Sequence, residues 1–252
     1  MNLKSKNPFL GSKSFSNTSR NADNTSVIFE DTMTVSGAIN KSFILLFALL
    51  GAAFLSWYFT AQGYNPMIFI IGGGIVGLIL VLIASFKPTT SPWVAPGYAL
   101  FEGLFIGGIS ALFEAMYPGI VIQAVSCTFV TFIVCFLLYK YQIVKVTEKF
   151  KSVVVAATLA IFTYYLISWV LSLFMNFQPV HHGNSLMSIG ISVFVIVIAA
   201  LNLFLDFDQI EKGAEKQMPK YMEWFSAMGL MITLVWLYVE FLRLLSKLSS
   251  RD

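Results

Sequence analysis

The stretch MIFIIGGGIVGLILVLIASF, residues 67–86, places twenty consecutive residues in the chain without a single charged side chain. A helix rises about 1.5 Å per residue, so roughly 20 apolar residues cross the hydrocarbon core of a bilayer, which is about 30 Å thick. Asn65-Pro66 precedes the stretch and Lys87-Pro88 follows it, and both are turn signals. The stretch therefore predicts a membrane-spanning helix.

Six further apolar stretches lie on either side of it, and together they predict an all-α integral membrane protein, a bundle of seven transmembrane helices. The expected spans are 43–61, 67–86, 98–117, 120–139, 153–175, 186–207 and 225–248. Composition supports this class, because 57% of the residues are hydrophobic and only 12% are charged. Soluble domains average roughly 45–50% apolar and about 25% charged residues. A soluble core of this chain length could not bury so much apolar surface.

The segment before the first span is different in composition. Residues 1–36 are rich in Asn, Ser and Thr and lack the apolar run of a signal peptide. We expect a disordered cytoplasmic tail over 1–39 and the seven-helix transmembrane domain over 40–252. The short apolar patch 27–29 could dock on the membrane surface, but a passive tail is the favoured interpretation.

Basic residues alternate between successive loops, and this predicts the orientation of the bundle. They occur before the first span and in the second, fourth and sixth loops, whereas the first, third and fifth loops contain none. By the positive-inside rule the N-terminus is then cytoplasmic. Arg243, Lys247 and Arg251 conflict with this pattern, because seven spans place the C-terminus outside. A re-entrant last segment is the alternative.

Glycine is concentrated in the second and third expected spans. Residues 72–74 are all glycine, Gly77 follows one turn later, and Gly103 and Gly107 form a GxxxG pair. Small residues at this spacing let helices approach closely. We therefore expect these glycines to serve helix packing rather than substrate binding.

Acidic side chains inside the apolar spans are the candidate functional residues. A carboxylate at bilayer depth costs about 3 kcal/mol on insertion scales, so it usually faces a cavity, a partner or a proton path. The candidates are Glu102, Glu114, Asp206, Asp208 and Glu240.

Glu240 lies deep in the last span, and Arg243 follows three residues later on the same helical face. A local ion pair with Arg243 and a titrating carboxylate inside the bundle are both open. Asp206 and Asp208 close the sixth expected span, either as a solvated helix end or facing the interior. In the second case they would form a pH-dependent latch, because neighbouring carboxylates in a low-dielectric site cannot all stay ionised without cost.

The two acids of the third span have simpler interpretations. Glu114 lies near the turn at Pro118-Gly119, where it could attract cations at an outer mouth, although an ordinary interfacial acid is favoured. Glu102 is expected near the cytoplasmic side with a structural role.

Several classes of function lack support in the sequence. Gly-x-Ser-x-Gly, His-Glu-x-x-His and P-loop motifs are missing, so we expect no catalytic residues and no cofactor. No basic stripe with interleaved aromatics occurs, which argues against nucleic acid as a partner. Cys127 and Cys135 would lie about 12 Å apart along a helix, too far for a disulfide. His181 and His182 have no cysteine near them to complete a metal site.

Two motifs in the C-terminal third carry a family resemblance. They are LDFDQI at 205–210 and TLVWLYVEFLRLL at 233–245. With the seven-helix layout, these motifs resemble the transmembrane Bax inhibitor motif family (Bax inhibitor-1-like), most of all a bacterial branch of it. That family pairs an aspartate late in its sixth helix with an acid in its seventh, and the second acid is glutamate here.

The resemblance implies a pH-sensitive passive calcium leak channel of the bacterial cytoplasmic (inner) membrane, gated by paired carboxylates of the sixth and seventh helices. Carried over, the pair is Asp206 and Glu240, with Asp208 as a register alternative and Arg243 as a competing partner. Calcium would be the permeant ion and would bind transiently at Asp206 and Glu240. The partners are then lipid, calcium and protons. The alternative function is a membrane scaffold that modulates another membrane protein, such as a quality-control protease, without transport.

Overall fold

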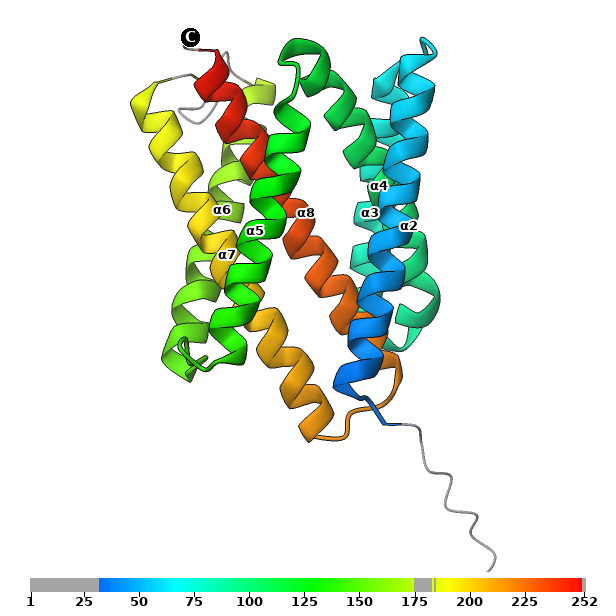
Figure 1. Cartoon of the computed structure of the whole chain (residues 1–252), viewed down its shortest axis with the longest axis vertical. Coiled ribbons are helices and arrows are strands. Elements are labelled where there is room, and N and C mark those ends of the chain that lie inside the picture. Colours follow the sequence, from blue (N-terminus) through cyan, green and yellow to red (C-terminus); the bar gives the residue numbers. More distant parts are fainter. Residues whose placement is uncertain (1–31, 175–182, 184, 251–252) are drawn as a thin grey trace, which may run out of the picture.

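The computed structural model describes residues 32–174, 183 and 185–250, and this part of the chain folds into a bundle of seven long helices (Figure 1). All seven are long and apolar enough to cross a membrane, so the predicted all-α seven-helix fold is confirmed. The helices are α2 (Val35–Ala61), α3 (Pro66–Phe86), α4 (Ser91–Met116), α5 (Ile120–Lys140), α6 (Glu148–Phe174), α7 (Leu186–Glu215) and α8 (Tyr221–Ser249), with a short 3₁₀ turn η2 (Pro88–Thr90).

Helix α2 begins eight residues before the predicted start of the first span. Thr34 caps it, because the Thr34 hydroxyl accepts a hydrogen bond of 2.9 Å from the backbone N–H of Gly37. Residues 35–39, which the sequence assigned to the tail, are therefore helical. The rest of the predicted tail through residue 31, including the patch at 27–29, lies outside the described residues.

Of the other helices, α4 and α7 extend furthest beyond their predicted bounds. Helix α4 starts at Ser91 rather than 98, because Pro92 sits in the first turn, where a missing N–H costs nothing, and the helix continues through Pro96. Helix α7 runs to Glu215, eight residues past its predicted end. This extension packs against the segment before α2, because a Cβ at Gly213 would lie 2.8 Å from the Met33 sulfur atom.

Helix α8 is the most buried of the seven spans and lies at the centre of the bundle. Helices α2, α3 and α4 form one group and α5, α6 and α7 another, and α8 crosses obliquely between them (Figure 1). It packs against α2, α4, α5 and α7. Fully buried leucines at Leu237 and Leu242 anchor it there. Polar side chains on its buried face, such as Thr233 and Glu240, therefore lie inside protein, whereas Arg243 is 45% exposed.

The course of α8 bears on the number of spans. It is one continuous helix of 29 residues, and its C-terminal end lies at the opposite end of the bundle from the start of α2 (Figure 1). A helix of this length extends about 43 Å, more than the hydrocarbon core requires. This length and course favour seven spans over a re-entrant last segment.

The glycines of α3 and α4 mark the closest helix contacts. A Cβ built on Gly103 would lie 2.4 Å from the Leu49 carbonyl oxygen of α2, and one on Gly107 would lie 2.1 Å from that of Ala53. On α3, a Cβ at Gly73 would lie 2.5 Å from the Phe101 carbonyl oxygen of α4. The predicted packing role is confirmed for Gly73, Gly103 and Gly107, whereas a Cβ at Gly72 would meet no atom within 4 Å.

Candidate functional site

Asp206 lies in α7 at its contact with α8, and its carboxyl group is incompletely satisfied. Its Oδ2 atom is buried and has no hydrogen-bond partner among the described residues. Its Oδ1 atom faces Gly229 of α8, where a Cβ would come to within 3.9 Å of it. The Thr233 hydroxyl, which donates to the Gly229 carbonyl oxygen at 3.3 Å, is a polar neighbour of this carboxyl group. A buried carboxyl oxygen without a partner is costly, so a proton, a water molecule or a cation would stabilise this site.

The face of α8 that meets Asp206 is small and polar. Ser226, Gly229 and Thr233 lie three and seven residues apart and so share one side of the helix. The hydroxyl oxygen of Ser226 is also buried without a partner in the described part of the chain. The sequence analysis did not name Ser226 and Thr233 as candidates. Polar residues seven positions apart in an apolar span share one helical face, and this spacing could have indicated a polar contact inside the bundle. Asp206 and Ser226 thus each have one buried oxygen atom without a partner among the described residues.

Asp208 points to a different neighbour although it is only two residues from Asp206. Its Oδ2 atom lies 2.8 Å from Nζ of Lys151 in α6, and its Oδ1 atom lies 2.8 Å from Nζ of Lys212 in α7. Both oxygen atoms therefore make charge-assisted contacts. Asp208 ties α6 to α7, and of the two aspartates only Asp206 keeps an oxygen atom without a partner.

Glu240 is almost completely buried, with 1% of its surface exposed, between α8 and α6. Its Oε1 atom accepts hydrogen bonds from Arg243 at 3.0 Å and from the hydroxyl of Tyr165 at 3.3 Å. The Arg243 guanidinium also lies over the Tyr165 ring, 5.7 Å from its centroid. Its Oε2 atom is buried without a partner among the described residues. Glu240 thus combines the two interpretations of the sequence, a local ion pair and a carboxyl oxygen inside the bundle.

The structure does not bring Asp206 and Glu240 together. Asp206 meets α8 at Gly229, and Glu240 lies eleven residues further along that helix. At 1.5 Å per residue this separation is about 16 Å, far beyond hydrogen-bonding distance. The predicted carboxylate pair is therefore not formed in this structure, and the two acids occupy separate sites. Arg243, the competing partner, is the residue that binds Glu240.

A family model described as "Bax inhibitor 1 like" matches residues 7–250. The chain belongs to the Bax inhibitor 1 like family. The match covers all seven helices as well as both C-terminal motifs, so the resemblance inferred from these motifs is confirmed. No curated protein and no solved structure matches the chain.

The other acids predicted in this Bax inhibitor 1 like protein have structural contacts. The Glu114 carboxylate accepts backbone N–H groups of Gly119 at 2.6 Å and Val121 at 3.2 Å, so it caps the start of α5. This geometry supports the interfacial interpretation over a cation mouth. Glu102 packs on α3, where a Cβ at Gly77 would lie 2.7 Å from its Oε2 atom.

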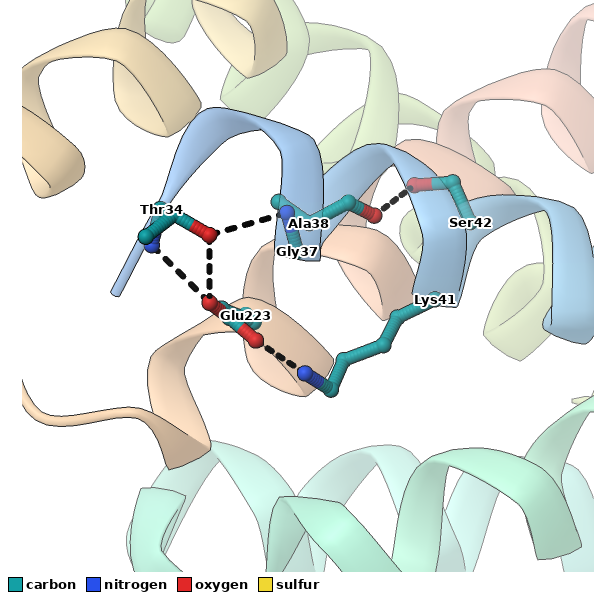
Figure 2. Close-up of polar contacts among 6 residues, drawn as sticks. All are labelled: Thr34, Gly37, Ala38, Lys41, Ser42 and Glu223. Carbon is teal, nitrogen blue, oxygen red and sulfur yellow. Dashed lines mark hydrogen bonds and ion pairs between the residues drawn. The ribbon is translucent and has the colours of Figure 1, made fainter. Parts of the chain in front are cut away.

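A second buried polar cluster, which sequence analysis missed, joins the start of α2 to the start of α8 (Figure 2). Glu223 of α8 has 1% of its surface exposed. Its Oε1 atom accepts hydrogen bonds from the backbone N–H of Thr34 at 2.9 Å and from the Thr34 hydroxyl at 3.1 Å, and its Oε2 atom pairs with Lys41. Gly37 leaves room for the carboxylate, because a Cβ there would lie 2.2 Å from Oε1. The partners are 182 or more positions apart, so spacing could not reveal them.

The opposite end of α8 contains a buried lysine of this Bax inhibitor 1 like protein. Lys247 is only 8% exposed, and its ammonium donates hydrogen bonds to the Ser188 carbonyl at 3.2 Å and the Ser192 hydroxyl at 2.7 Å. Lys247 and Arg243 are thus held by protein groups and are not loop charges, which removes most of the conflict with the positive-inside pattern. Arg251 lies outside the described residues.

The sequence predicted neither a disulfide at the two cysteines nor a metal site at the two histidines. Cys127 and Cys135 are free thiols. Within the described ranges no group of three or more His, Cys, Asp or Glu side chains could hold a metal ion. His181 and His182 lie outside those ranges.

Proposed function

We propose that this Bax inhibitor 1 like protein is a passive, non-enzymatic cation leak whose conductance depends on protonation of Asp206 and Glu240, with calcium as the permeant ion. One observation carries the proposal. In the described part of the chain, the buried carboxyl oxygen atoms without a partner are Asp206 Oδ2 and Glu240 Oε2. Both belong to the contacts of the central helix α8.

The chemistry of such oxygens supports a gate that responds to pH. When a buried carboxyl group is protonated it is neutral, and the helix contact around it can stay dry and closed. When the proton leaves, the buried charge favours water and a cation at the same place. Calcium prefers oxygen ligands such as carboxylates and hydroxyls, and Asp206 with the neighbouring Thr233 supplies them at the α7–α8 contact. Flux is therefore expected to rise with pH.

The distance between Asp206 and Glu240 implies that they bind protons independently and not as a pair. Groups more than about 7–10 Å apart usually behave additively. Because Asp206 and Glu240 lie about 16 Å apart along α8, each takes up its own proton. The Arg243 guanidinium lies 3.0 Å from the Glu240 carboxylate, whereas the described contacts of Asp206 include no cation. Asp206 is therefore the main pH-responsive group in this proposal.

Calcium flux into liposomes that contain a calcium-sensitive dye tests this function across a pH series. Asp206→Asn should remove most of the pH dependence, because the amide keeps the size of the carboxyl but cannot titrate. Glu240→Gln should have a smaller effect, and the double variant should show the sum of the two effects. Glu215→Gln, on an exposed residue of the same helix, is the matched control and should keep the wild-type profile.

Two outcomes would contradict the proposal. A wild-type pH profile in both Asp206→Asn and Glu240→Gln would remove these acids from gating. Wild-type protein that passes no calcium at any pH would favour the alternative function, a scaffold that modulates another membrane protein without transport.

We also propose that the protein lies in the cytoplasmic membrane with the start of α2 on the cytoplasmic side. The α5–α6 loop, which is flanked by lysines in the ends of both helices, and the α7–α8 loop lie at the same end of the bundle as this helix start (Figure 1). A reporter that fluoresces only in the cytoplasm should be bright when fused before Met1 and dark after Asp252. A bright C-terminal fusion would refute this orientation or the seven-span count.

A further inference from the structure

An apolar groove of about 770 Å³ runs along α5, with walls from α2, α7 and α8. Its floor is aromatic, because Phe132, Phe136 and Tyr139 of α5 pack around Phe207 of α7 with ring centroids 5.6–5.7 Å from that of Phe207. A second cavity of about 330 Å³ continues along α5 towards α4. The two share Phe129 and residues of α2 and α8.

The length of the larger groove matches one leaflet of a bilayer. Its lining residues on α5 run from Phe129 to Lys140, a distance of eleven residues or about 16 Å along the helix. Half of a hydrocarbon core of about 30 Å is close to this length. A transmembrane helix of a partner would need a large groove across the whole core, whereas the second cavity, which occupies the other half, has less than half the volume. An acyl chain of a single leaflet fits the larger groove better.

Lysine side chains line the mouth of the groove, at the C-terminal end of α5. Lys140 and Lys145 line this mouth and make no ion pair in the described part of the chain. The acids at the same mouth are already engaged, because Asp208 binds Lys151 and Lys212, and Glu211 accepts the hydroxyl of Tyr139. Glu211 keeps its charge, because a tyrosine hydroxyl does not neutralise a carboxylate, but the three lining lysines outnumber the two lining acids, so the mouth is net positive.

We propose that this groove binds an anionic phospholipid of the leaflet next to the α5–α6 loop. One acyl chain lies between α2 and α5 on the aromatic floor, and the phosphate lies between Lys140 and Lys145. Lysine near an anionic lipid surface attracts it appreciably, and apolar burial holds the chain. This binding is independent of calcium transport, so its test does not depend on flux.

Native mass spectrometry of the full chain, released from detergent with phosphatidylglycerol or phosphatidylcholine added at equal concentration, tests the proposal. We expect wild-type protein to retain one phosphatidylglycerol in preference to phosphatidylcholine. Lys140→Gln/Lys145→Gln should weaken phosphatidylglycerol retention about 30-fold, because two lysine–phosphate attractions are lost. The control is Lys149→Gln, which removes an exposed lysine of the same segment that does not line the groove.

A second variant tests the chain position separately from the headgroup. Ile133 lines the groove and is 51% exposed, so Ile133→Trp should fill the chain site and reduce retention of both lipids. If this variant fails to fold, the lysine variants still decide the headgroup site. Equal phosphatidylglycerol retention in the double lysine variant and the Lys149→Gln control would overturn the proposal. So would wild-type protein that appears as a lipid-free dimer, because a second copy would then fill the groove.

Discussion

Replacing Gly107 with valine is expected to abolish the close contact between α4 and α2. A Cβ at this position would lie 2.1 Å from the Ala53 carbonyl oxygen and 2.2 Å from the Ser56 hydroxyl. The Ser56 hydroxyl also donates a hydrogen bond of 3.0 Å to the Leu104 carbonyl across the same contact. Backbone cannot move aside as a flexible side chain can, so the helices must separate. The loss should reach or exceed the upper end of the range of about 1–3 kcal/mol that overpacking costs.

The control for this prediction is a glycine of the adjacent helix with open space around it. A Cβ at Gly72 of α3 would have no neighbouring atom within 4 Å, so Gly72→Val should leave the fold intact. Size-exclusion chromatography and thermal midpoints of detergent-solubilised protein measure the difference. Gly107→Val should be aggregated or have a strongly lowered midpoint. Equal midpoints for the two valine variants would show that α2 and α4 are not packed as described.

Removing Lys41 is expected to produce the other large effect, at the cluster that joins α2 to α8 (Figure 2). Among the described residues, Lys41→Met leaves the carboxylate of Glu223, which is 1% exposed, with Thr34 as its one partner. Breaking a buried ion pair from one side typically costs about 3–5 kcal/mol, because the remaining charge is buried without compensation. Glu223→Gln should cost less, since Lys41 is 15% exposed and its ammonium can turn towards water.

A double-mutant cycle separates the pair from its surroundings. The double variant Lys41→Met/Glu223→Gln should be less destabilised than the sum of the single variants, because it leaves no buried charge. The matched control is the ion pair of Glu148 and Lys151, in which Glu148 is 87% exposed. Glu148→Gln should change stability by at most about 1 kcal/mol. Strict additivity in the cycle, or an equally large loss in the control, would refute the role of this buried pair.

Sequence alone was sufficient for the features that depend on the bilayer. Crossing it demands helices of roughly 20 apolar residues, so the run at 67–86 and its six counterparts identified all seven spans. The close contact at Gly103 and Gly107 was also predictable, because small residues are what close helix packing in lipid requires. Helix ends were less accurate, since caps such as Thr34 and buried residues beyond the apolar run extend the helices.

Only the tertiary structure decided which acid does what. Asp206 and Asp208 are two positions apart in the sequence. Asp206 faces α8 with one carboxyl oxygen atom that has no partner among the described residues, whereas Asp208 binds Lys151 and Lys212. These helices are apolar on all sides, and lipid is as apolar as leucine, so periodicity carries little information about which face meets which neighbour. The distance from Asp206 to Glu240 and the pairing of Lys41 with Glu223 depend on the lateral order of helices far apart in the chain. The sequence therefore determined what crosses the membrane, and helix packing determined which charged groups meet inside it.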